Sequence, residues 1–168
     1  MACSVNTSKE VELNKLRFNY TDDAYLFFRN MRQRQYDLEV MEEGGWRIYR
    51  HEDRQQDTSG FYFNVSLVVN WKLNRVYPII EMTEQLKKEG LVVEWRALES
   101  DESGKLTLEG IKRRDEMLFV SKIYNKMTEE VEFFISIENQ KTPLFPNTDA
   151  KEAFRISLYD FYRMTGLL

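Results

Sequence analysis

Two different spacings of apolar residues follow one another between residues 105 and 137. In residues 105–114, KLTLEGIKRR, the spacing fits an extended strand, whereas in 115–128 apolar side chains recur at the spacing of an amphipathic helix. Residues 131–137, VEFFISI, fit a second strand. This order predicts a strand–helix–strand (βαβ) crossover. The residues of the first strand that are expected to face the core are Leu106, Leu108 and Ile111.

Three further stretches predict helices. Residues 21–23, Thr-Asp-Asp, supply a cap and first-turn acids for a helix that holds Phe27 and Phe28. Residues 82–90 predict a helix that ends at its terminal glycine. Residues 147–149 offer three capping side chains for a last helix with a broad apolar stripe.

Strands are predicted where apolar residues alternate with polar ones or form short runs. Residues 61–71, 75–80 and 91–98 have this pattern. The polar run 53–60 predicts a turn or a mobile loop, and the two prolines of 142–147 predict another loop. Together with the helices, these strands predict an α+β fold with a central, mixed, twisted sheet of about five strands flanked by helices.

Three segments have patterns with more than one interpretation. Residues 11–18 fit either a strand or the start of a helix, and residues 36–41, YDLEVM, either prolong the preceding helix or begin another element. After Gly44 and Gly45, apolar and polar residues alternate as in a strand. Trp46 and Ile48 would share one face of this strand, and Arg50 is the next candidate for the same face.

The chain has 168 residues and a mass of 20.2 kDa, which predicts a single domain, residues 1–168. The lone Cys3 has no partner for a disulfide, so we expect an intracellular protein. A polar start and the absence of a long apolar run predict a soluble protein without membrane contact.

The net charge of −4 argues against a global attraction to nucleic acid, so any such contact must be local. One candidate is the basic run that contains Arg29, Arg32 and Arg34. The other basic run stands at the end of the first crossover strand, close to the acidic residues considered below as metal ligands. We predict that this second run binds RNA. Its residues are Lys112, Arg113 and Arg114.

The sequence lacks the residues that most classes of enzyme require for catalysis. His51 is the only histidine, and the sequence contains no G-x-S-x-G turn, no Cys/His zinc cluster and no phosphate-binding or dinucleotide-binding glycine motif. His51, Glu52 and Asp53 are adjacent, so on a strand they point to opposite faces and do not converge on one metal ion.

A carboxylate site for Mg²⁺ or Mn²⁺ remains. Such a site takes oxygen ligands from residues that are distant in sequence and converge at strand ends. Glu81 stands at a predicted strand-to-helix junction, and further acids would have to come from Glu94, Glu99, Asp101 or Glu109.

Five collinear segments resemble the N-terminal domain of the orthomyxovirus polymerase acidic subunit (PA), which in influenza is the cap-snatching endonuclease. They are YDLEV at 36–40, VYPIIEMTEQ at 76–85, EGIKRRDEMLFVSKIYNKM at 109–127, FISI at 134–137, and the closing helix at 149–168. The resemblance implies a PD-(D/E)XK nuclease-like core with a βαβ crossover. It also implies that residues 1–168 are the N-terminal part of a longer polymerase subunit.

The metal site of that family carries over only in part. Its glutamate falls on Glu81, but its histidine falls on Asp37 and its strand glutamate on Leu108. The aspartate before the crossover falls on Ala97, with Glu99 or Asp101 nearby, and the catalytic lysine falls on Ile123, one position from Lys122 and thus about 100° round the helix.

These departures imply a catalytically degenerate member, of a thogotovirus-like branch, that has lost its metal site and its cofactor and retains a structural or RNA-guiding role in transcription. The degenerate positions are Asp37, Glu81 and Leu108. By the same resemblance, the partners are other viral polymerase subunits, with RNA as a further partner, in the host cell nucleus and the virion.

Two alternatives stay open. The first is an active Mn²⁺- or Mg²⁺-dependent RNA endonuclease, which requires Glu81 plus Asp37, Glu99 or Asp101, and Lys122 to converge. The second is a non-viral α+β binding module, which a sheet that is antiparallel throughout and lacks a crossover helix would indicate.

Overall fold

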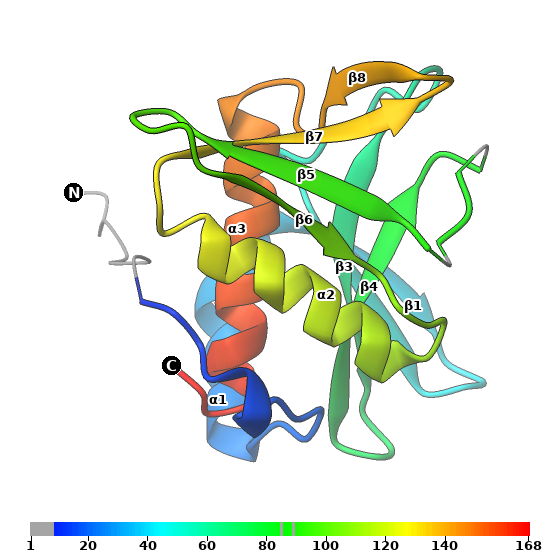
Figure 1. Cartoon of the computed structure of the whole chain (residues 1–168). Helices are drawn as coiled ribbons and strands as arrows, with labels where there is room; N and C mark the ends of the chain where they lie inside the picture. The colour runs from blue at the N-terminus through cyan, green and yellow to red at the C-terminus, as the bar shows by residue number, and fades with distance from the viewer. Residues whose placement is uncertain (1–8, 85, 89) are drawn as a thin grey trace.

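A computed structural model describes residues 9–84, 86–88 and 90–168. It contains two four-stranded sheets and three α-helices, and every hydrogen-bonded pair of strands is antiparallel (Figure 1). The α+β class is therefore confirmed, whereas the single mixed sheet of about five strands is wrong. Cys3 lies outside the described residues.

Sheet A has the strand order β1-β2-β3-β4 and follows the chain as a meander. Its strands are β1 Tyr36–Met41, β2 Trp46–His51, β3 Phe63–Asn70 and β4 Arg75–Met82. Residues 36–41, YDLEVM, therefore form strand β1 and do not prolong the preceding helix. A tight turn after Met41, with Gly45 at φ +69°, lets β1 fold back on β2. The stretch 53–60 is irregular, as predicted.

Sheet B has the order β6-β5-β7-β8. Its strands are β5 Val92–Ala97, β6 Ser103–Thr107, β7 Val131–Ile137 and β8 Gln140–Pro143. The helix α2, Arg113–Lys126, connects β6 to β7. Both of these strands are antiparallel to β5, so they run parallel to each other with β5 between them. The predicted crossover therefore exists, with one strand inserted.

The remaining helices begin at the predicted caps. Helix α1, Asp22–Phe27, starts after Thr21, whose side chain accepts a hydrogen bond from the Ala24 amide, and the chain continues as a π-helical turn over Phe28–Arg32 and a 3₁₀ turn over Gln33–Gln35. Helix α3, Thr148–Met164, is capped by Asn147. The ambiguous segment 11–18 holds only a 3₁₀ turn, Leu13–Lys15.

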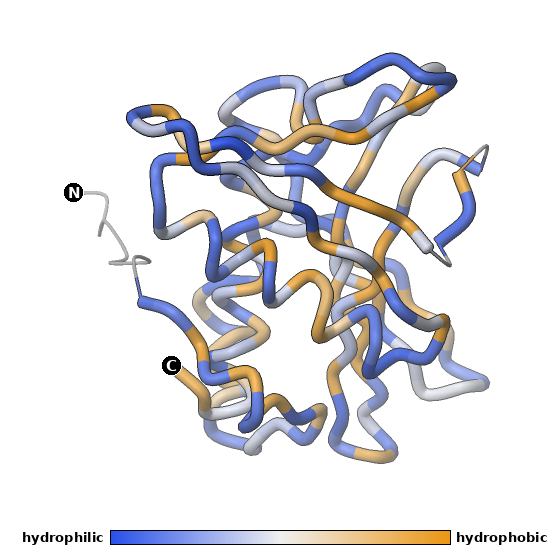
Figure 2. Tube along the Cα trace, viewed as in Figure 1, coloured by the Kyte–Doolittle hydropathy of each residue, from blue (hydrophilic) through white to orange (hydrophobic). Residues whose placement is uncertain are grey.

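Helices α2 and α3 lie beneath sheet B and beside sheet A (Figure 1). They contact each other where the hydroxyl of Tyr162 donates to Ser121 at 2.7 Å and the rings of Tyr124 and Tyr162 meet edge to face. Hydrophobic and hydrophilic residues alternate along α2 and α3 (Figure 2), as expected of helices that bury one face. One continuous core joins the helices to both sheets.

The predicted helix over 82–90 is wrong. Strand β4 extends to Met82, which pairs with Phe63, and the described residues from 83 to 90 form turns and bends; residues 85 and 89 lie outside the described part. A helix this short cannot offset the free energy of nucleation unless tertiary contacts bury one of its faces.

The first crossover strand is shorter than predicted. Strand β6 ends at Thr107, and Arg113 and Arg114 belong to the first turn of α2, not to a strand end. The Asp115 carboxylate accepts a hydrogen bond from the Lys112 amide at 2.9 Å, and this cap starts the helix. Consequently Ile111 is 69% exposed instead of facing the core.

The predicted loop over 142–147 is also too long, because β8 includes Thr142 and Pro143. Strand β8 lies at the edge of sheet B, where a proline is tolerated since its missing amide need not serve a neighbouring strand.

Candidate functional site

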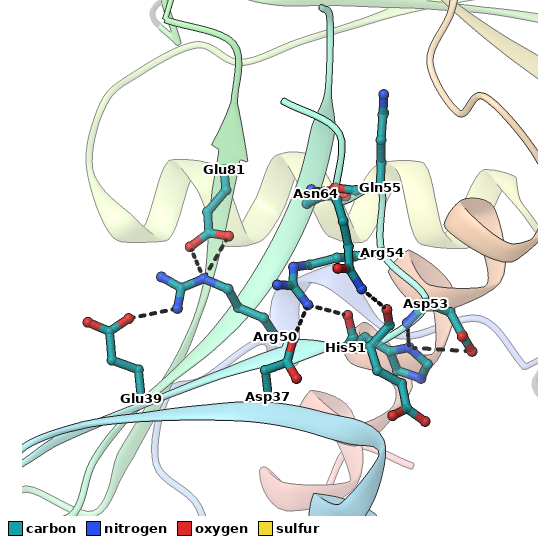
Figure 3. Close-up of polar contacts among 11 residues, drawn as sticks. Asp37, Glu39, Arg50, His51, Asp53, Arg54, Gln55, Asn64 and Glu81 are labelled. Carbon is teal, nitrogen blue, oxygen red and sulfur yellow. Dashed lines mark hydrogen bonds and ion pairs between the residues drawn. The ribbon is translucent and has the colours of Figure 1, made fainter. Parts of the chain in front are cut away.

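Glu81 lies near the end of β4 and is held by an arginine. Nε of Arg50, on β2, lies 2.8 and 3.1 Å from the two carboxylate oxygens of Glu81. The Nη1 atom of Arg50 donates to Glu39, on β1, at 2.8 Å. Figure 3 shows Arg50 between these two carboxylates. One guanidinium group therefore links three strands of sheet A.

Asp37 lies on the same face of β1 as Glu39, two residues away, and it has its own arginine. Nη1 of Arg54 donates to the Asp37 carboxylate at 2.7 Å and to the backbone carbonyl of His51 at 2.9 Å (Figure 3). Arg54 lies in the irregular chain after β2, which ends at His51, so this part of the chain is tied back to β1. Each of the two acids of β1 thus has an arginine partner.

A pocket of about 470 Å³ opens beside these ion pairs. It lies between the end of β4 and the irregular stretch that follows β2, and it combines both signs of charge. Its charged lining consists of Arg50, Arg54, Lys88, Glu81 and Glu84.

Burial disfavours the charged form of Arg50, but hydrogen bonds and the negative charges of Glu39 and Glu81 outweigh burial, and the pKa of Arg50 is raised. The guanidinium group therefore stays charged and occupies both oxygens of Glu81 with one donor nitrogen. A divalent ion that used Glu81 as a ligand would have to displace this pair or share its oxygens, with a positive charge close by.

Glu99 and Asp101 lie in the turn between β5 and β6 and are exposed. This turn is at the far end of β5 from the segment that follows Glu81 (Figure 1). At about 3.3 Å per residue, β5 alone separates the two places by roughly 17 Å. The structure therefore does not bring Glu99 or Asp101 to Glu81.

Lys122 projects from α2 into a different and much smaller cavity, of about 30 Å³, which it lines together with Glu109 and Asp115. Leu108 is fully buried, and its backbone pairs with Leu91. Its side chain is part of the hydrophobic core and leaves no room for a ligand at that position. Ile123 is also fully buried.

The basic triplet, Lys112, Arg113 and Arg114, lies at the start of α2, where all three side chains are exposed. Arg113 lies over two aromatic rings of sheet A, with its guanidinium carbon 4.3 Å from the ring centre of Tyr77 and 5.1 Å from that of Trp46. Among the described residues, no acid forms an ion pair with the side chain of Lys112, Arg113 or Arg114. Cations at a helix N-terminus are disfavoured by the helix dipole, so this triplet does not stabilise α2.

Sequence reasoning missed the residues that complete the site. Arg50 was recognised only as the next position of an alternating face, and Arg54 and Glu39 were not singled out. The available signal was the pair of glycines at 44–45, which makes β1 and β2 a hairpin and sets Asp37 opposite Arg50. A further missed residue is Glu116, which is buried on α2 and accepts a hydrogen bond from the Ile80 amide at 2.9 Å.

Within the described ranges, no three or more histidine, cysteine, aspartate or glutamate side chains are grouped so that they could hold a metal ion. None of the helices in the described part is long and apolar enough to cross a bilayer. Comparisons of the chain with family models, with curated proteins and with solved structures find no match.

Proposed function

We propose that this chain is the N-terminal endonuclease-like domain of a viral RNA-dependent RNA polymerase subunit, of the orthomyxovirus type, in which arginine–carboxylate pairs stand in place of a metal site. The observation that carries the proposal is the contact of Arg50 with both oxygens of Glu81. In such a site the positive charge that a divalent ion would supply comes from the protein itself. We infer a PD-(D/E)XK-like core from the resemblance and from the β6-α2-β7 crossover.

The role that remains for such a domain is structural, within a polymerase, or one of guiding RNA. Lys112, Arg113 and Arg114 support RNA guidance because they are exposed cations at one place on a chain of net negative charge. Contacts of this kind bind phosphates and do not read sequence. Other polymerase subunits, the host nucleus and the virion belong to the same proposal.

The active-enzyme alternative requires Glu81 to leave Arg50 and to meet further ligands that lie elsewhere in the fold. The binding-module alternative is favoured by one observation, the antiparallel pairing of every strand. It is opposed by the crossover helix α2 between two parallel strands. We therefore retain the degenerate nuclease as the first candidate.

Manganese titration, followed by calorimetry and thermal unfolding, tests the proposal together with an assay of single-stranded RNA cleavage. We expect no saturable heat, no stabilisation and no cleavage. An active site would instead stabilise the fold by about 2.7 kcal/mol at 100-fold excess over the dissociation constant. Such a shift, lost in Glu81→Ala together with metal-stimulated cleavage, would contradict the proposal.

The same protein serves to test RNA guidance by titration with labelled single-stranded RNA. Replacing Lys112, Arg113 and Arg114 with alanine should weaken binding and reduce the salt dependence, by about 0.7 in the logarithmic slope for each lost phosphate contact. Lys15→Ala/Arg96→Ala/Lys141→Ala is the matched control, because it removes the same number of exposed positive charges outside both basic runs. Equal losses in the two variants would leave only the structural role.

A further inference from the structure

Each sheet of this protein has two edges, and three of these four edges are protected. Strand β8 is four residues long and contains Lys141 and Pro143, and β6 carries Lys105. Lysine, proline and shortness are the usual devices that prevent an edge from pairing with a foreign strand.

The outer edge of β4 is covered by other parts of the chain. The Val76 amide donates to the carbonyl of Phe18 at 2.8 Å, and the Ile80 amide donates to the buried carboxylate of Glu116 at 2.9 Å. Pro78 removes a further donor from this strand. A foreign strand could therefore not pair along β4.

Strand β1 is the exception. It is six residues long, contains no lysine, proline or glycine, and among the described residues pairs with β2 alone. The Glu52 amide donates to the carbonyl of Gln35, one residue before β1, at 2.9 Å. Because antiparallel pairs alternate between bonded and non-bonded, the backbone groups of Tyr36, Leu38 and Val40 point away from β2.

The side chains of β1 differ between its two faces. On one face Leu38 and Val40 are 41% and 46% exposed. On the other face the side chains of Asp37 and Glu39 remain 62% and 54% exposed although each has an arginine partner. Two more acids, at 42–43, follow the strand. The edge therefore offers free hydrogen-bonding groups, an apolar side and an acidic side.

We propose that the outer edge of β1 binds an extended segment of another polypeptide in which basic and apolar residues alternate, so that this segment becomes a fifth strand of sheet A. Its apolar side chains lie beside Leu38 and Val40, and its lysine or arginine side chains lie beside Asp37 and Glu39. Backbone hydrogen bonds supply affinity, and the alternation sets the register.

Charge argues against a second copy of this chain as the occupant. Two β1 strands paired edge to edge would bring Asp37 and Glu39 of one copy close to the same acids of the other. Like charges on neighbouring strands are destabilising. A basic partner strand reverses the sign of that contribution.

The probe is a capped peptide of alternating lysine and valine, titrated into the whole chain and followed by calorimetry. We expect saturable binding that weakens as salt is added. Leu38→Pro removes an outward amide and leaves the pairing with β2 intact. In this variant and in Val40→Lys, the affinity for the peptide should fall about tenfold or more. Leu98→Lys is the matched control, because Leu98 is 58% exposed and follows β5 of sheet B, whereas β1 belongs to sheet A.

Circular dichroism establishes that each variant is folded, and Val40→Lys decides alone if Leu38→Pro does not fold. A peptide in which glutamate replaces lysine should not bind. Equal affinity of the original chain, Val40→Lys and Leu98→Lys would overturn the proposal, as would the absence of saturable binding. Self-association that Val40→Lys abolishes, measured by sedimentation without peptide, would overturn it in favour of a second copy.

Discussion

His51 is a buried histidine at the end of β2, with its ring edge against the ring of Tyr36 at 5.1 Å between centres. Its Nδ1 accepts a hydrogen bond from the Asp53 amide at 3.2 Å, whereas its Nε2 has no partner among the described residues. Burial lowers the pKa of His51 below its ordinary value of 6.5, with nearby Arg32 acting in the same direction against Asp53, Asp160 and Glu52. The fold therefore favours the neutral ring.

This lowered pKa predicts how stability depends on pH. At and below about pH 6.5 the unfolded chain binds the proton at His51 more readily than the folded chain, so the free energy of unfolding falls as the pH is lowered through this range. Above it, His51 is neutral in both states and contributes no slope. Urea unfolding between about pH 7.5 and pH 5.5 checks this, with His51→Gln as the comparison. Parallel pH curves for the two proteins would contradict it.

At the scale of elements, α2 is joined to sheet A by a carboxylate rather than by apolar contacts alone. The Glu116 carboxylate accepts a hydrogen bond from the Ile80 amide of β4 and forms an ion pair with Nζ of Lys88 at 3.2 Å. The side chain of Glu116 is only 8% exposed. Three elements meet at this one group: α2, β4 and the turns after β4. The irregular segment that was expected to be a helix is thus held by an ion pair.

Replacing Glu116 should lower the free energy of unfolding more than replacing an exposed glutamate does. In Glu116→Leu the Ile80 amide and Lys88 lose their partner, and we expect the free energy of unfolding to fall by about 1–3 kcal/mol. Glu130→Leu, at an exposed position, should change it by less than about 0.5 kcal/mol. Denaturant unfolding measures both values. Similar values for the two variants would mean that Glu116 does not hold these elements together.

At the scale of the whole molecule, a buried cluster connects the first third of the chain to its last helix. Nε of Arg32 lies 3.0 and 3.3 Å from the Asp160 oxygens, and the hydroxyl of Tyr36 donates to Asp160 at 2.7 Å. Burial raises the pKa of Asp160, and the two donors act against burial by favouring the carboxylate. The cluster joins the turn after α1, strand β1 and helix α3.

Removing one charge of this cluster should destabilise the whole fold. Arg32→Met leaves Asp160 buried without its cation, and we expect a loss of about 3 kcal/mol or more in the free energy of unfolding. The double variant Arg32→Met/Asp160→Leu should lose clearly less than the sum of the two single variants, because it leaves no unpaired charge. Urea unfolding of the four proteins completes the cycle. Strict additivity would show that the two charges do not depend on each other.

Local sequence patterns were sufficient for the elements whose signals lie within a few residues. Alternation identified β3 and β7, and the capping residues within 21–23 and 147–149 located the starts of α1 and α3, since a cap side chain bonds an amide only three residues away. Where a local signal competed with a tertiary one, as in residues 82–90, the pattern failed.

The sequence by itself determined the α+β class, the crossover helix and the position of Glu81 near a strand end. Only the tertiary structure decided that Arg50 would meet Glu81, that the acids at 99 and 101 would stay at the far end of β5, and that β1 would be left as an open edge. The physical reason is that periodicity fixes which face of a strand a side chain takes, whereas its partner depends on register and strand order, which are set by contacts between residues far apart in the chain.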